Sequence, residues 1–335
     1  MILNPGILAL LLGGLISFSL MLYAAGLGLK ILRNWDRTQS SEAQLLLERK
    51  TWLVSSLVNF ALGFQVLSGL LFLYTLEDIH NLFVGAMCGT GSLNANPIGW
   101  VVLLVKVFLF FLAASWVAIN RLDQQTEETP LVRPKYLALL VLTPLVGLDL
   151  YLLYSYFSGL RPAIITSCCG ALFGLGNDTV ASDLAALPPQ ETMLFFYVSA
   201  AICLLLILSC LRSQVAILRP LLFSAVLVFF FIALVSVISF ISLYIYEMPS
   251  HHCPFDMLQR NYGYIGYPLY TTLFAGVFFG MLPGLCQPLK KLPGVQQQIQ
   301  RREKNWLLLS LGGLLAFVLI SGWSIWFGPF ILLGY

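Results

Sequence analysis

Cysteine and histidine side chains in the segments between apolar runs are the residues of this sequence with the clearest capacity for chemistry. Thiolate and imidazole groups ligate zinc and copper, and paired thiols can exchange with disulfides. The stretch "SHHCPFD" holds two histidines beside a cysteine, and "SCCG" holds two adjacent cysteines. The candidate cluster comprises His80, Cys88, Cys168, Cys169, His251, His252 and Cys253.

The elements that must position these residues are membrane helices. The chain is 59% hydrophobic and only 10% charged, whereas soluble proteins carry about 25% charged residues. An apolar run of roughly 20 residues crosses a hydrocarbon core of about 30 Å. We therefore predict an all-α, polytopic integral membrane protein, residues 1–335 forming a single domain of about eight transmembrane helices. The predicted helices span approximately 6–32, 51–75, 97–119, 136–158, 193–211, 219–246, 263–285 and 305–328.

The distribution of positive charge predicts the orientation of these helices. Fifteen of the 18 Lys and Arg residues lie in connecting segments on one side, whereas the other side holds only Arg161 and Arg260. Because cytoplasmic loops are enriched in Lys and Arg, both termini are expected on the outer, extracytoplasmic side. The outer loops are then 76–96, 159–192 and 247–262. We expect a multi-pass protein of a cell membrane, with the bacterial inner membrane as the predicted location.

All residues of the candidate cluster fall in these outer loops, and one interpretation of them is structural. Disulfides form on the oxidising side of a membrane and could staple the loops together. Since adjacent cysteines rarely pair with each other, Cys168 and Cys169 would bond to Cys88 and Cys253. This arrangement would stabilise the protein, and it leaves the three histidines without a role.

A second interpretation is metal binding. A mixture of Cys and His suits a soft or borderline metal ion, with copper or zinc as the candidates. The adjacent cysteines in "SCCG" resemble the paired thiols of bacterial mercury-transport membrane proteins. The sequence has no C-x-x-C or H-x-x-x-H spacing, so the site would have to assemble from three loops. Among the functional interpretations we favour this one, in which the protein captures or transfers a soft metal ion.

A third interpretation is a membrane thiol-disulfide oxidoreductase. The stretch "HHCPFD" resembles the start of a Cys-Pro-x-Cys redox motif, in which a second thiol resolves the mixed disulfide. Asp256 stands at that resolving position. Cys253 would therefore have to exchange with Cys88 or with the "CC" pair, and protonated neighbouring histidines would favour its thiolate.

The remaining functional class is a non-catalytic membrane subunit of a larger complex. Its stapled outer loops would dock a membrane or extracytoplasmic protein partner, while the lipid bilayer surrounds its helices. No Walker-type phosphate loop is present, so we expect no nucleotide-binding domain in this chain. The net charge of +3 follows from the topology and does not predict nucleic-acid binding. No motif assigns a catalytic residue or decides whether the protein is an enzyme.

Two ionisable residues are predicted within the membrane, where charged side chains are costly. Lys106 and Asp149 each lie about nine residues from the outer end of their helix, at roughly 13 Å of depth. They can therefore form an intramembrane polar pair if their helices touch, either as a structural ion pair or as a proton- or ion-coupling site. Asn59 and Gln65 could extend this polar patch.

Gly276, Gly280 and Gly284 form successive G-x-x-x-G steps in the seventh predicted helix. Such a surface lets a second helix approach closely. We predict a helix-packing face here, with an internal helix as the favoured partner.

Overall fold

The computed structural model describes residues 3–35, 42–126, 129–161, 180–292 and 294–332. Every regular element within these ranges is helical, and eight helices are long and apolar enough to cross a membrane, which confirms the predicted fold class. A helix suits lipid because it satisfies its own backbone hydrogen-bonding groups. The helices divide into two compact units, each described by itself below.

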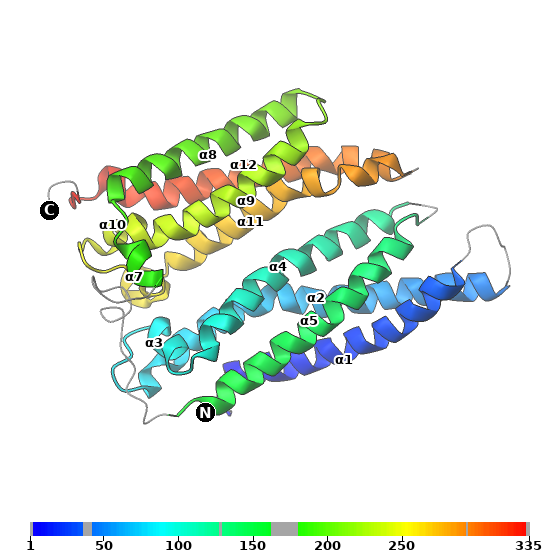
Figure 1. Cartoon of the computed structure of the whole chain (residues 1–335), viewed down its shortest axis with the longest axis horizontal. Helices are drawn as coiled ribbons and strands as arrows, with labels where there is room; N and C mark the ends of the chain where they lie inside the picture. Colours follow the sequence, from blue (N-terminus) through cyan, green and yellow to red (C-terminus); the bar gives the residue numbers. More distant parts are fainter. Residues whose placement is uncertain (1–2, 36–41, 127–128, 162–179, 293, 333–335) are drawn as a thin grey trace. The chain divides into compact units, whose positions relative to one another are not determined.

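Unit 1 comprises Met1–Thr75, Leu93–Arg161 and Leu292–Gln298. Its long helices are α1 (Pro5–Asn34), α2 (Glu42–Ile79), α4 (Ile98–Asp123) and α5 (Val132–Gly159) (Figure 1). The α5 helix packs against both α1 and α4. All four helices contribute to one buried apolar core, which includes Met21, Val58, Leu109, Trp116, Tyr136 and Val146.

Unit 2 comprises Leu76–Ser92, Pro162–Lys291 and Ile299–Tyr335. Its long helices are α8 (Pro189–Arg212), α9 (Leu218–Ser236), α11 (Gly266–Leu285) and α12 (Val295–Phe327). Its short elements are η1 (His80–Leu82), the first residues of α3 (Gly89–Asn94), α7 (Val180–Ala185), η3 (Asp256–Leu258), η4 (Arg260–Tyr262) and η5 (Pro288–Lys291). At the centre, the ring centroid of Phe196 lies 5.8 Å from that of Phe229, 5.7 Å from that of Phe240 and 5.9 Å from that of Phe317. These aromatic contacts join α8, α9 and α12.

The membrane-spanning helical segment that begins with α9 extends beyond Ser236. It continues through a π-helical turn, η2 (Val237–Ile241), into α10 (Ser242–Tyr246). The helix ends at Glu247, whose φ of 54° lies in the left-handed region. A π-helical turn leaves backbone groups without their usual partner one helical turn away, and such turns occur often at functional sites.

The G-x-x-x-G glycines lie on the face of α11 that meets neighbouring helices of unit 2. A Cβ built at Gly276 would come within 2.8 Å of the backbone nitrogen of Leu314 in α12, so only glycine allows this approach. Ser310 Oγ donates a hydrogen bond of 2.7 Å to the carbonyl of Gly276. Gly280 lies against both Ser310 of α12 and Val226 of α9, whereas Gly284 lies against Phe223 and Arg219 of α9.

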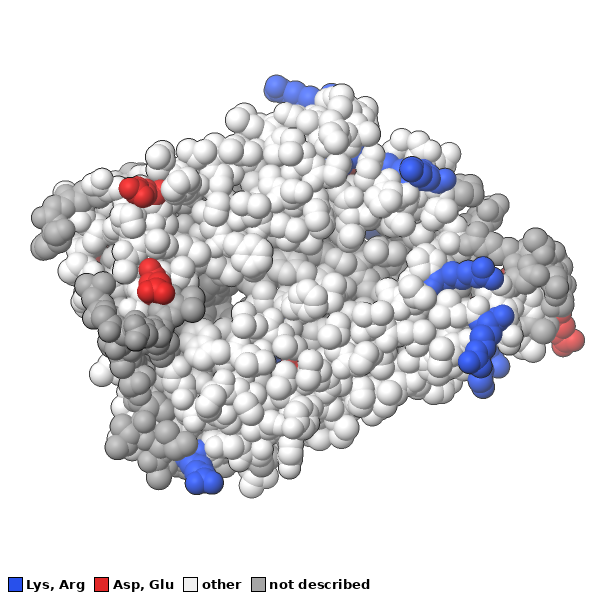
Figure 2. Space-filling model, viewed as in Figure 1, with Lys and Arg blue, Asp and Glu red and all other residues white. Residues whose placement is uncertain are grey.

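The flanks of the helices are suited to lipid. In Figure 2 they are almost wholly without charged side chains, and most of the Lys and Arg visible on this face gather at one end of the helices. That distribution fits a multi-pass membrane protein, since aliphatic and aromatic side chains face hydrocarbon and charges stay near water.

Candidate metal centre

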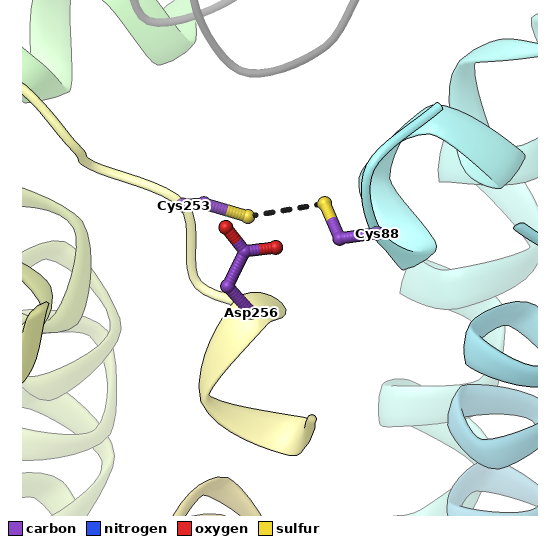
Figure 3. Close-up of side chains that lie close together, drawn as sticks. All are labelled: Cys88, Cys253 and Asp256. Atoms are coloured by element: carbon purple, nitrogen blue, oxygen red, sulfur yellow. Dashed lines mark hydrogen bonds between the residues drawn. The ribbon is translucent and has the colours of Figure 1, made fainter. Parts of the chain in front are cut away.

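Two cysteines that are distant in sequence meet inside unit 2. Cys88 precedes α3, and Cys253 lies between α10 and η3. Their sulfur atoms are 3.4 Å apart, and both residues are fully buried (Figure 3). Thr90 Oγ1 lies 3.3 Å from the Cys253 sulfur and adds a polar contact on the same side.

Asp256 completes the group. Its carboxylate lies beside both sulfurs in Figure 3, and one ligand atom from each of the three residues falls within 4.8 Å of the others. Asp256 Oδ2 is hydrogen-bonded to His251 Nε2. Within the described part of the chain, the buried Oδ1 has no hydrogen-bond partner. A buried carboxylate oxygen left in that state costs free energy unless a ligand binds it.

The sequence around Cys253 places both side chains on one side of a tight turn. The backbone N–H of Phe255 donates to the Cys253 sulfur at 3.4 Å. Asp256 then begins η3, and the N–H of Gln259 donates to its carbonyl. The bond from the Phe255 N–H holds the Cys253 sulfur over the segment that leads into η3, so the spacing Cys-x-x-Asp brings the thiol and the carboxylate together.

Two tyrosines fix this turn. The hydroxyl of Tyr246, at the end of α10, donates to the carbonyl of Cys253 at 2.6 Å and accepts the N–H of Met257 at 2.9 Å. The hydroxyl of Tyr270 in α11 donates to the carbonyl of Pro254 at 2.6 Å. Both ends of the turn are therefore held by buried hydroxyl groups on membrane helices.

The segment that carries Cys88 is held by α2. Glu77 Oε2 accepts the N–H of Gly89 at 2.9 Å, and Ser92 Oγ donates to the carbonyl of Leu76 at 2.8 Å. These contacts cap the first turn of α3 and fix the backbone next to the thiol. His80 contacts Glu77 through both the backbone carbonyl and the carboxylate.

The three histidines take separate positions. His251 is the partner of Asp256, and its ring lies against Tyr246. His252 Nδ1 lies 2.9 Å from the carbonyl of Ile238 in the π-helical turn, so Nδ1 carries the proton there. Burial lowers the pKa of His252, which keeps this imidazole neutral at pH 7. Among the described residues, the converging ligand atoms belong to Cys88, Cys253 and Asp256.

The other cysteines do not join this group. Cys168 and Cys169 lie outside the described residues. Cys203 and Cys210 are buried within α8, and Cys286 is buried at the end of α11. Buried cysteines of this kind commonly pack as small apolar residues. Disulfides to Cys168 or Cys169 and a three-loop cluster therefore stay predictions.

Sequence reasoning missed Asp256 as a candidate ligand. It was considered only as the residue that replaces a resolving cysteine, although Cys-x-x-Asp has the same spacing as a Cys-x-x-Cys ligand pair. Tyr246 and Tyr270 carry the sequence signal of aromatic residues at the membrane interface, whereas both hydrogen-bond to the turn. The signal available in the sequence was the carboxylate three residues after a loop cysteine.

The intramembrane residues lie in unit 1. Lys106 Nζ is 3.1 Å from Asp149 Oδ2, and both side chains are buried. Gln65 reaches this pair through Ser68, whereas the side chain of Asn59 contacts Asn120 instead.

Comparison of the chain with known protein families, with curated proteins and with solved structures finds no match. The function must therefore be argued from the geometry.

Proposed function

We propose that this multi-pass membrane protein binds a soft or borderline metal ion through Cys88, Cys253 and Asp256. The observation that supports the proposal most directly is the convergence of two sulfur atoms and a carboxylate oxygen of Asp256, a buried residue whose Oδ1 has no hydrogen-bond partner in the described part of the chain. Two thiolates and a carboxylate form a ligand set used for zinc, and thiolates also bind Cu(I).

The sulfur separation supports a metal ion more than a disulfide. Two thiolates bound to one tetrahedral zinc ion at about 2.3 Å lie roughly 3.8 Å apart. The observed 3.4 Å therefore needs a change of about 0.4 Å. A disulfide needs both sulfurs to close to about 2.05 Å, which is a change of more than 1 Å.

The carboxylate favours zinc over copper. Cu(I) prefers sulfur ligands alone, whereas zinc accepts sulfur and oxygen together. His251 holds Asp256 Oδ2, and such outer partners orient metal ligands. Three protein ligands leave a fourth coordination position open, as in sites where an ion is exchanged or reacts.

A second candidate function is thiol redox exchange, because Cys88 and Cys253 are two cysteines whose sulfurs lie next to each other without a bond between them. Cys88 and Cys253 would form a disulfide and pass two electrons and two protons to an acceptor of the disulfide or quinone class. Asp256 would then have no ligand role. The two functions make different predictions for the carboxylate, because metal binding needs it and disulfide formation does not.

The test is metal content combined with thiol state. The protein is purified in nanodiscs under reducing conditions, dialysed with zinc or with Cu(I), and analysed by inductively coupled plasma mass spectrometry. We expect about one zinc ion per chain, lost in Cys88→Ser and Cys253→Ser and weakened in Asp256→Asn. Cys203→Ser, in a buried thiol of α8, is the matched control and should retain zinc.

Differential alkylation of the same samples separates the alternatives. A reducible Cys88–Cys253 disulfide in protein that takes up neither metal, and unchanged redox behaviour in Asp256→Asn, would replace metal binding by thiol exchange. Uptake of Cu(I) but not zinc would keep the site and overturn the choice of metal.

A further inference from the structure

Positive charge is concentrated at one end of unit 2, and the proposed metal centre does not use it. The charged residues lie in 212–219, which joins α8 to α9, in 286–291 after α11, and in 299–304 at the start of α12. Together these segments contain seven Lys and Arg residues and one acidic residue, Glu303. This end of unit 2 therefore carries a formal charge of +6.

A buried carboxylate holds these segments together. Glu303 Oε1 is hydrogen-bonded to Arg219 at the start of α9, and Glu303 Oε2 accepts from Lys290 Nζ at 2.6 Å. The Arg219 side chain also donates to the carbonyl of Val215 at 2.8 Å and to Gln214 Oε1 at 3.1 Å. Both oxygens of Glu303 are thus occupied by these two cations.

The remaining charge at this end includes four exposed side chains. The surface that they form is termed the basic rim, and its residues are Arg212, Lys291, Arg301 and Lys304. Among the residues that the structure describes, none of the four takes part in an ion pair. The charge of the basic rim is therefore available to an anion from outside the chain.

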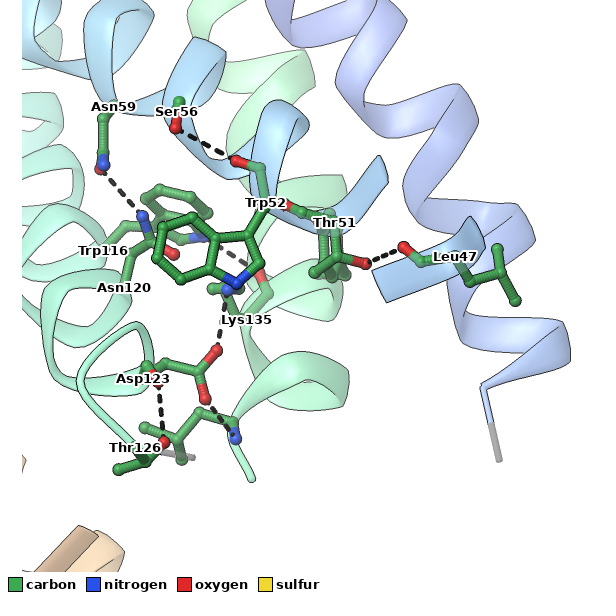
Figure 4. A network of polar contacts seen from close by, with 12 residues as sticks. Leu47, Thr51, Trp52, Ser56, Asn59, Trp116, Asn120, Asp123, Thr126 and Lys135 are labelled. Atoms are coloured by element: carbon green, nitrogen blue, oxygen red, sulfur yellow. Dashed lines mark hydrogen bonds and ion pairs between the residues drawn. The ribbon is translucent and has the colours of Figure 1, made fainter. Parts of the chain in front are cut away.

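The connections of unit 1 that are expected on the same membrane side have a different charge balance. Segments 30–50 and 121–135 contain eight basic and six acidic residues, which leaves a formal charge of only +2. Part of this balance is buried, since Lys135 Nζ donates to Asp123 Oδ2 at 2.8 Å (Figure 4). A general enrichment of Lys and Arg on one membrane side applies to both units, so it does not explain the excess in unit 2.

The basic rim continues into helix faces that suit hydrocarbon. Arg301, Lys304 and the exposed Leu308 lie at positions i, i+3 and i+7 of α12, which places them on one face. On α8, the exposed Leu205 lies seven residues before Arg212 and shares its face. A phospholipid has the same order, with a phosphate above apolar chains. An acidic soluble protein would match the charge and leave the apolar part of these faces without a partner.

We propose that the basic rim binds the headgroups of anionic phospholipids, whose acyl chains lie along the exposed faces of α8 and α12. Each Lys or Arg near a membrane surface strengthens the attraction to anionic lipid by roughly fivefold. A zwitterionic phospholipid has the same phosphate but carries its own cation, so the basic rim attracts it less. The ion pairs of Glu303 hold η5 and the start of α12, and thereby position the rim residues that these segments carry.

Native mass spectrometry of the delipidated full chain in detergent tests the proposal. Phosphatidylglycerol and phosphatidylcholine with identical acyl chains are titrated separately, and circular dichroism verifies folding. We expect phosphatidylglycerol to bind about tenfold more tightly or better, with a preference that falls as the ammonium acetate concentration rises. Inorganic phosphate should not displace the lipid, because it has no acyl chains. Its displacement of the lipid would overturn the proposal in favour of a site for free phosphate.

Variants locate the site on the chain. The combined variant Arg212→Gln, Lys291→Gln, Arg301→Gln and Lys304→Gln should lose the preference for phosphatidylglycerol. The matched control removes four exposed cations of unit 1 and should retain the preference: Lys30→Gln, Arg33→Gln, Arg49→Gln and Lys50→Gln. If the fourfold rim variant does not fold, the double variant Arg301→Gln and Lys304→Gln decides, with an expected loss of about fivefold or more.

Three results would overturn the proposal. The first is equal binding of both lipids by folded wild-type protein, which would leave the basic rim to an acidic protein partner. The second is a preference that survives in the folded rim variants. The third is an equal loss in the unit 1 control, which would mean that the lipid responds to the total charge of the protein and not to the basic rim.

Discussion

Gln259 Nε2 donates a hydrogen bond of 2.8 Å to the backbone carbonyl of Met87. Met87 directly precedes Cys88, and Gln259 follows Asp256 by three residues. This contact therefore joins the two segments that carry the candidate metal ligands, and it does so with an uncharged side chain that is not itself a ligand.

We expect Gln259→Ala to lower zinc affinity by about tenfold or more, the usual effect of removing outer support from metal ligands. The reason is geometric, because Cys88 and Cys253 lose a direct tie between their segments. Isothermal titration calorimetry measures the affinity, and the exposed neighbour Arg260→Ala is the control. Equal affinity in both variants would show that other contacts fix the sulfur separation.

His251 gives a sharper test of how Asp256 is oriented. His251→Ala should weaken zinc binding by about 10- to 100-fold, since the carboxylate loses the imidazole that holds Oδ2. His251→Gln retains an N–H donor and should recover part of the affinity. His252→Gln, at a side chain that contacts Ile238, should bind zinc as the wild type does. A loss in His252→Gln as large as in His251→Ala would contradict this division of roles.

Proton release identifies the ligand atoms. Thiols must lose their protons to bind zinc, so binding should release about two protons near neutral pH and weaken as the pH falls. Calorimetry in buffers of different ionisation enthalpy counts these protons. Cys253→Ser should release about one proton fewer. A zinc-binding wild type that releases none would mean that the sulfurs are not the ligands.

The close approach of α11 to α12 predicts a stability difference between two glycines. Gly276→Ala places a methyl group 2.8 Å from the backbone of Leu314 and should destabilise the protein by about 1–3 kcal/mol. Gly312→Ala, in α12, meets nothing within 4 Å and should be neutral or slightly stabilising. Thermal unfolding in a single detergent compares them. Equal melting temperatures would mean that α11 and α12 separate at little cost.

The helices could be predicted from the sequence because membrane spans depend on local composition. Each apolar run is long enough to cross the bilayer, and no distant contact is needed to make it helical. Depth along a helix is also local information, which is why Lys106 and Asp149 could be placed at the same level. Which face of a helix meets a neighbour depends on packing. Only the structure therefore shows that Gln65 is linked to that pair and that Asn59 contacts Asn120 instead.

The candidate metal centre was harder to predict because its ligands come from distant segments. The sequence indicates that Cys88 and Cys253 share an expected membrane side, but 165 positions separate them and loop paths are not encoded in composition. Asp256 could not be recognised as a candidate ligand because comparison with a Cys-Pro-x-Cys redox motif identified it only as the residue that replaces the second cysteine. The hydrogen bonds of Tyr246 and Tyr270 to the turn could not be predicted either, because a tyrosine that anchors a loop has the same sequence signal as one in an interfacial belt.

The π-helical turn between α9 and α10 amounts to the insertion of one residue into a membrane helix. Deleting one residue from 237–241 would restore an ordinary helix, and the residues after it would keep roughly their orientation, because the wider π-turn holds its extra residue within one turn. The Tyr246 hydroxyl would then still reach the carbonyl of Cys253, whereas the carbonyl of Ile238, which the π-turn presents to His252, would return to ordinary helical bonding. A feature inside the transmembrane helix thus holds His252, the residue directly before Cys253.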